Sequence, residues 1–173
     1  LAWWPLDGFL PPVDLVGSHS TVAVGQSFQP GYSGSSLFLS GTGYVATPWP
    51  SPAPGAPQRF PIDAWIKVDC ETQSCPPPGE HPIRPHRASS SSRGLELFLQ
   101  PATGQLGGRV GDGTTTLSAY QLSGASLLDN AWHLVAMTFD GSDTVELWVD
   151  GQRVATSTAA SSLGSIATGN LAF

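Results

Sequence analysis

Two tryptophans and one histidine are the residues best suited to bind a ligand. Trp65 lies in 60–69, FPIDAWIKVD, and Trp148 in 144–149, TVELWV; apolar and polar residues alternate in both runs. This period of two indicates strands and places both tryptophans opposite the aliphatic face. His133 joins them there if the strands share one sheet. Exposed aromatic rings stack on sugars or anchor protein interfaces, so Trp65, Trp148 and His133 are the candidate ligand-binding residues. The alternative is that long loops cover them.

The two cysteines favour a disulfide over a metal site. Cys70 and Cys75 lie in a chain with only 12% charged residues, a composition that favours an extracellular, oxidising environment. His81 and His86 follow, so free thiols and a zinc site are the alternatives. A zinc finger places about 12 residues between its Cys and His pairs, with the His pair on a helix. Here the pairs are much closer and prolines crowd them. We expect a Cys70–Cys75 disulfide and no metal site.

The carboxylates do not have the spacing of a catalytic pair. A glycoside hydrolase needs two carboxylates about 5 to 10 Å apart across a cleft. Asp69 and Glu71 alternate at the mouth of the cysteine loop, outside any strand, and Asp150, four residues after Glu146, belongs to a turn. No nucleophile elbow, phosphate loop or Ser/His/Asp spacing occurs in the sequence, and His133 is expected to be packed or at the solvent edge. We therefore expect that the chain is not an enzyme.

Short strands are the elements that must position these residues. The run 132–156, WHLVAMTFDGSDTVELWVDGQRVAT, predicts three antiparallel strands, joined by a turn at 140–143 and by a type I′ turn at Asp150-Gly151. Both faces of the first strand are apolar, and we expect Leu134 and Leu147 in the core. No helix longer than one turn is expected. Further strands are predicted within residues 1–10, 21–24, 36–40, 44–47, 60–69, 95–99, 105–110 and 116–122.

The composition is typical of one all-β domain. Glycine (20) and proline (16) are abundant among 173 residues, a length that allows a two-layer core. Residues 48–58 hold five prolines and predict an extended connector, and residues 70–93 predict a long polar surface insertion. The net charge of −6 argues against a nucleic-acid or anionic-membrane partner, and no apolar run is long enough for membrane insertion. The chain begins at Leu, so we expect a processed chain or a piece of a longer one.

Several spaced motifs resemble laminin-G-like domains of the concanavalin A-like jelly-roll fold. They are WHLVA at 132–136, TFDG at 138–141, VELWVDG at 145–151, WPLD at 4–7, the segment 36–47 and the strand 60–69. The resemblance implies an all-β antiparallel β-sandwich, a single domain over 1–173 with its insertion at 70–93.

The same resemblance implies a function. It indicates a non-catalytic extracellular or cell-surface module for recognition or adhesion, within a larger protein, that binds a glycan or an extracellular protein. One alternative is a structural module that packs against neighbouring domains of the same polypeptide or assembly. Another is a glycan-active enzyme.

Calcium is the one cofactor that the resemblance leaves open. Many relatives of this fold bind it through loop carboxylates and backbone carbonyls. Asp140 and Asp143 share one turn, and Asp7 and Asp14 share the first loop region. No run has the oxygen density of a calcium loop, so no ligand is assigned.

The resemblance also concerns how the sandwich closes. Relatives usually follow a segment like Gly169–Phe173 with one more strand, which lies beside the first strand of the domain. We therefore expect that a closing strand exists outside these 173 residues.

Overall fold

The computed structural model describes residues 3, 5, 14–17, 21–48, 59–68, 81–85, 93–100, 103–121, 124–164 and 170–172. Within these ranges the regular elements are eleven β-strands, paired antiparallel in three sheets. The predicted all-β class is confirmed. None of the described segments is a helix with the length and apolarity needed to cross a bilayer. The chain divides into two compact units, Leu1–Ser51 with Gly169–Phe173, and Pro52–Thr168. The single-domain organisation stays a prediction.

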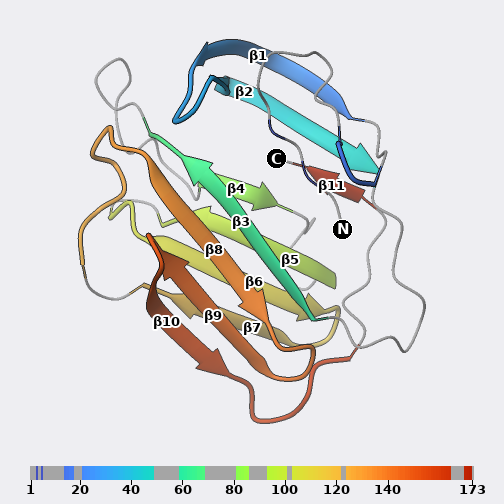
Figure 1. Ribbon diagram of the computed structural model, residues 1–173. Helices are drawn as coiled ribbons and strands as arrows, with labels where there is room; N and C mark the ends of the chain where they lie inside the picture. The colour runs from blue at the N-terminus through green and yellow to red at the C-terminus, as the bar shows by residue number, and fades with distance from the viewer. Residues whose placement is uncertain are drawn as a thin grey trace. The chain divides into compact units, whose positions relative to one another are not determined.

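The smaller unit contains a three-stranded sheet in the order β1-β2-β11 (Figure 1). Its strands are β1 (Val22–Pro30), β2 (Ser35–Pro48) and β11 (Asn170–Ala172). The expected turn at 41–43 does not end β2, because the extra residues are taken up by a register irregularity opposite Gly25, whose φ is +66°. β1 is also longer than predicted, since its second half pairs with the start of β2.

The larger unit is a two-layer sandwich. One sheet has the order β10-β9-β8-β3, and the other has the order β4-β5-β6-β7 (Figure 1). The strands are β3 (Phe60–Ile66), β4 (His81–Pro85), β5 (Arg93–Leu99), β6 (Leu106–Asp112), β7 (Thr116–Tyr120), β8 (His133–Phe139), β9 (Thr144–Val149) and β10 (Gln152–Thr158). Buried side chains from both sheets form one core. Its members are Ile62, Leu97, Leu99, Leu106, Val110, Leu117, Ala119, Leu127, Val135, Met137, Phe139, Val145, Leu147 and Leu163.

The run 132–156 folds into adjacent antiparallel strands, as predicted. The φ angles of Asp150 and Gly151 are 50° and 79°, as a type I′ turn requires. Leu147 is fully buried at 0% exposure, also as predicted. The prediction for Leu134 is wrong. Its neighbour Val135 points into the core, so the half-buried Leu134 lies on the outer face of the sheet. Both faces of β8 are apolar, and periodicity alone therefore could not choose between them.

The predicted surface insertion at 70–93 includes a strand, β4, which pairs with β5 at the edge of its sheet. Pro82 and Pro85 lie within β4, and an edge strand tolerates proline because one side of its backbone needs no ladder partner. Cys70 and Cys75 fall outside the described residues, as does the connector at 49–58. The disulfide stays a prediction.

Candidate ligand-binding face

The outer side of sheet β10-β9-β8-β3 carries aromatic and charged side chains in register. In one row, Trp65 of β3 lies opposite Leu134 of β8. The next row runs Asp63, Ala136, Trp148, Arg153 across the four strands, and the row beyond it includes Thr138 and Glu146. We call this surface the tryptophan face and define it by Asp63, Trp65, Leu134, Ala136, Thr138, Glu146, Trp148 and Arg153.

The tryptophan face is open to solvent. Trp65 is 45% exposed, and Asp63 and Arg153 are also exposed. Trp148 is half-buried, and its Nε1 is the one buried side-chain nitrogen or oxygen in the described residues that has no hydrogen-bond partner. Ala136, between Asp63 and Trp148, has the smallest side chain of the face. The structure therefore brings Trp65 and Trp148 onto one surface, as the alternation predicted.

One pair of opposite charges lies on this face. Arg153 Nη1 donates to Glu146 Oε1 at 2.6 Å, and Thr138 Oγ1 donates to Glu146 Oε2 at 3.4 Å. The side chains of Arg153 and Glu146 are 55% and 26% exposed, so solvent screens their attraction. The Asp63 side chain makes no hydrogen bond or ion pair with the described residues. Its carboxylate is available as an acceptor.

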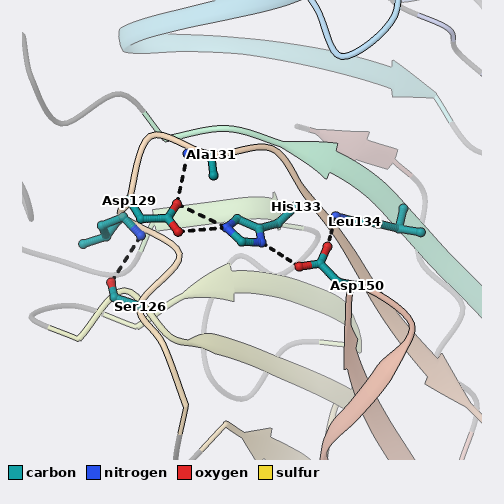
Figure 2. A network of polar contacts seen from close by, with 7 residues as sticks. Ser126, Asp129, Ala131, His133, Leu134 and Asp150 are labelled. Atoms are coloured by element: carbon teal, nitrogen blue, oxygen red, sulfur yellow. Dashed lines mark hydrogen bonds and ion pairs between the residues drawn. The ribbon is translucent and has the colours of Figure 1, made fainter.

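His133 is held between two carboxylates at the start of β8 (Figure 2). Its Nδ1 lies 2.8 Å from Asp150 Oδ2, and its Nε2 lies 3.1 Å from Asp129 Oδ1. Carboxylates accept hydrogen bonds, so the ring donates from both nitrogens when it is the imidazolium. Backbone N–H groups orient the two acids, since Leu134 donates to Asp150 Oδ1 and Ala131 donates to Asp129 Oδ1.

The pKa values of these groups favour the charged forms. Burial is the largest influence on His133 and disfavours the imidazolium, but hydrogen bonds to Asp150 and Asp129 outweigh it and raise the pKa of His133 above 6.5. The hydrogen bond from His133 is the main cause of the lowered pKa of Asp150. The backbone N–H of Ala131 is the main cause of the lowered pKa of Asp129. His133 therefore ties the loop before β8 to the β9–β10 turn.

His133 does not share a surface with the tryptophans. It lies opposite Ile66 and has the same orientation as Val135, on the inward side of its strand. The expected gathering of Trp65, Trp148 and His133 therefore holds for the two tryptophans only. The sequence did not identify Asp63, Ala136 and Arg153 as site residues, because only the cross-strand register shows which residues flank Trp148.

The turn carboxylates considered for calcium cap the backbone. Asp140 Oδ1 accepts from the N–H groups of Ser142, Asp143 and Thr144. Asp14 accepts from the N–H groups of Trp3, Val16 and Gly17. The described residues contain no group of three or more side chains that could hold a metal ion. Asp7 lies outside them, and calcium binding stays an untested alternative.

Comparisons with known proteins identify a family and a fold. The family model Laminin_G_3, described as the Concanavalin A-like lectin/glucanases superfamily, matches residues 39–173. No curated protein sequence matches. One similar solved structure is the binding domain of Paraclostridial Mosquitocidal Protein 1, with a TM-score of 0.75 and 15% identity, over 99% of this chain and 44% of that one.

Two botulinum neurotoxin structures are also similar. One is of type C, whose cell entry is described as dependent on interaction with two ganglioside molecules, with a TM-score of 0.68 and 14% identity, over 99% of this chain and 42% of that one. The other is the binding domain of type DC in complex with SialylT, with a TM-score of 0.68 and 13% identity, over 99% of this chain and 43% of that one. This chain spans less than half of each of these structures. At such identities the likeness shows the fold alone, and it confirms the predicted antiparallel jelly-roll sandwich.

Proposed function

This chain belongs to the Laminin_G_3 family of the concanavalin A-like lectin/glucanases superfamily, and on that premise we propose that it is a carbohydrate-binding module whose ligand lies on the tryptophan face. The module is non-catalytic, acts outside the cell or at its surface, and serves recognition or adhesion within a larger protein. The observation that carries the proposal is the 45% exposure of Trp65 on a sheet that also presents Trp148.

An exposed tryptophan on a sheet is suited to carbohydrate. The C–H faces of a pyranose ring stack on an indole, and nearby polar side chains bind the hydroxyl groups. Asp63 and Thr138 supply such polar groups on the two sides of Ala136. The similar structures named for interaction with gangliosides and for a complex with SialylT support carbohydrate as the class of ligand. Those particular ligands are ligands of the neurotoxins.

Three carboxylates of this sheet and its loops are held in ion pairs, which favours binding over hydrolysis. Glu146 is paired with Arg153, and Asp129 and Asp150 are both bonded to His133. A general acid needs a carboxyl group with a raised pKa, whereas the pKa values of Asp129 and Asp150 are lowered. Incubation of the protein with each bound glycan, followed by measurement of reducing ends, tests this part. Hydrolysis of a glycan by the wild type that is lost in the Glu146→Gln variant would contradict the non-catalytic part of the proposal.

A glycan array tests the proposal directly. We expect the wild type to bind at least one glycan, and Trp65→Ala to weaken that binding by about tenfold or more, because a lost stacking contact is worth about 0.5–1.5 kcal/mol beyond its area. Trp148→Ala should also abolish binding. Tyr32→Ala is the matched control, since Tyr32 is a 63% exposed aromatic residue of the smaller unit. The proposal fails if no glycan binds, or if Tyr32→Ala weakens binding as much as Trp65→Ala.

A different surface favours the structural alternative. Trp3, Leu15 and Val16 are 59%, 59% and 52% exposed, and the backbone N–H of Leu15 donates to the carbonyl of Trp3 at 2.9 Å. Exposed apolar groups close together mark a surface that packs against another molecule or domain. Light scattering of the wild type and of Leu15→Ser tests this. Self-association that Leu15→Ser removes, without any glycan binding, would favour the packing module.

A further inference from the structure

The groups around Ala136 have a chemistry that narrows the class of ligand. We propose that the tryptophan face binds an uncharged hexopyranose unit seated over Ala136, with Asp63 accepting hydrogen bonds from its hydroxyl groups. This inference rests on the proposed carbohydrate binding and adds the charge of the sugar, its position and the residue that selects it.

Ala136 has the smallest side chain of the tryptophan face and lies between longer ones. In its own row it lies between Asp63 and Trp148, whose strands are each about 4.8 Å away from β8. Along β8, the neighbours on the same face are Leu134 and Thr138, each about 7 Å away. A methyl group is thus enclosed on four sides by longer side chains. Trp65, opposite Leu134, extends the apolar wall on one side.

Asp63 is the acceptor that a neutral sugar requires. An ionised carboxylate only accepts hydrogen bonds, and it can take two neighbouring hydroxyl groups at once. The carboxylate of Asp63 is exposed and makes no hydrogen bond or ion pair with the described residues. On the opposite side, the buried Nε1 of Trp148 is a donor without an acceptor. That nitrogen is too buried to contact a bound sugar, so Asp63 is the polar contact assigned to the ligand.

The charges of the face disfavour an anionic sugar. A carboxylate or sulfate over Ala136 would lie beside Asp63 and near Glu146. Arg153 already donates to Glu146 at 2.6 Å, so an anion would have to replace that partner. Two further cations flank β3 among the described residues: Lys67 is exposed just beyond its end, and Arg59 is exposed just before its start. The whole chain carries a net charge of −6, which repels anions at longer range.

Titration calorimetry with matched glycans tests the inference. The array glycan that binds best is compared in its neutral, sialylated and sulfated forms, at about 50 and 500 mM salt, where Debye screening differs strongly. We expect the neutral form to bind best, with an affinity that changes less than about twofold with salt. Asp63→Asn should weaken its binding by about tenfold or more, because a charge-assisted hydrogen bond is replaced by a weaker one.

Two bulky substitutions test the position of the sugar. Ala136→Leu occupies the proposed position of the sugar and should abolish binding, whereas Thr156→Leu places the same side chain on β10, in the row beyond Ala136, and should leave binding unchanged. Ala136→Val, a smaller change to a good strand former, should weaken binding by an intermediate factor and guards against a folding defect. Urea unfolding of each variant verifies that the sheet is intact.

The outcomes separate this inference from the proposed function. Preference for the sialylated or sulfated form, lost in Arg153→Met or Lys67→Met and kept in Asp63→Asn, would overturn the inference and leave carbohydrate binding in place. Neutral-glycan binding that Ala136→Leu does not change would overturn the position. Absence of binding to every glycan would overturn both.

Discussion

The two outer faces of the larger unit each carry an aromatic residue and an Arg–Glu pair, yet they differ in exposure. On sheet β4-β5-β6-β7, Phe98 is 0% exposed, and the Arg109 guanidinium lies 4.4 Å from its ring centroid. On sheet β10-β9-β8-β3, Trp65 is 45% exposed. An aromatic residue and an Arg–Glu pair are therefore buried on one face and largely exposed on the other. Residue type alone does not separate the two roles.

Small residues explain part of this difference. Gly107 lies between Phe98 and Tyr120 in the register of β5, β6 and β7, and a Cβ there would lie 2.5 Å from Phe98 Cζ. The missing side chain lets the phenyl ring cover the backbone, and Tyr120 meets that ring edge-on at 6.1 Å between centroids. Ala136 is the small residue of the other face, between Asp63 and Trp148, and its side chain is half-buried. The space beside Gly107 is therefore filled by a ring of the protein itself.

The largest expected effect is that of Phe98→Ala. Removal of a fully buried phenyl ring should lower the free energy of unfolding by about 3–5 kcal/mol, through lost burial and the cavity that remains. Trp65→Ala is the comparison on the open face and should cost less than about 1 kcal/mol. Urea unfolding followed by circular dichroism measures both. Equal costs for the two substitutions would remove the distinction between the faces.

Arg109→Met tests the charged partner of Phe98. Arg109 Nη1 lies 3.3 Å from Glu96 Oε2, and its Nη2 donates to Tyr120 Oη at 3.1 Å. The side chains of Arg109 and Glu96 are only 19% and 16% exposed, so the substitution leaves a poorly solvated carboxylate without its partner. We expect a loss of about 2 kcal/mol in urea unfolding. Double substitution with Glu96→Gln should recover part of it, and no recovery would count against the pairing.

The sequence predicted the strands of the larger unit better than it predicted their faces. The strands predicted at 95–99 and 60–69 form as β5 and β3, and the alternation along them agrees with the burial of Leu97 and Ile62 in the core. It could not show that Phe98 would be buried, because that depends on which β6 and β7 residues align with it. Register between distant strands is not encoded in the local pattern that alternation reads.

The candidate site was predictable to a similar extent. Alternation found the common face of Trp65 and Trp148, but His133 was assigned to it although it belongs to the inward side of β8. When a strand is apolar on both faces, its sequence shows the period of two but does not show which face points into the core. Leu134 was misplaced for the same reason. The partners of His133 come from a loop and a turn, and no strand pattern includes them.

His133→Gln tests how the open sheet is held at its end. The pKa of His133 is raised in the folded state, so its contribution is fully present below its ordinary value of 6.5 and is lost as pH rises through the folded value. The pKa values of Asp129 and Asp150 are lowered in the folded state. Their contribution to stability is therefore present above the ordinary value of 3.8 and is lost as pH falls through the folded-state pKa values. The stability difference between wild type and variant should therefore be largest at about pH 5–6.

We expect that difference to be about 1 kcal/mol, because the carboxylates of Asp129 and Asp150 are 44% and 50% exposed and solvent weakens both contacts. Urea unfolding of wild type and His133→Gln at a series of pH values measures it. The difference should shrink as pH rises from about 6.5 through the folded-state pKa of His133. A difference that grows over this range would mean that neutral His133 is the form that stabilises the fold.

Arg153→Met should have the smallest effect, although its contact with Glu146 is the shorter of the two Arg–Glu pairs, 2.6 Å against 3.3 Å. Exposure outweighs distance here. The Arg153 side chain is 55% exposed, so water solvates both charges after the pair is broken, and methionine keeps most of the apolar stem that covers the sheet. We expect a loss of about 0–0.5 kcal/mol in urea unfolding, vanishing at about 1 M salt. A loss as large as that of Arg109→Met would mean that Arg153 is covered in solution, and the tryptophan face would then be closed to a ligand.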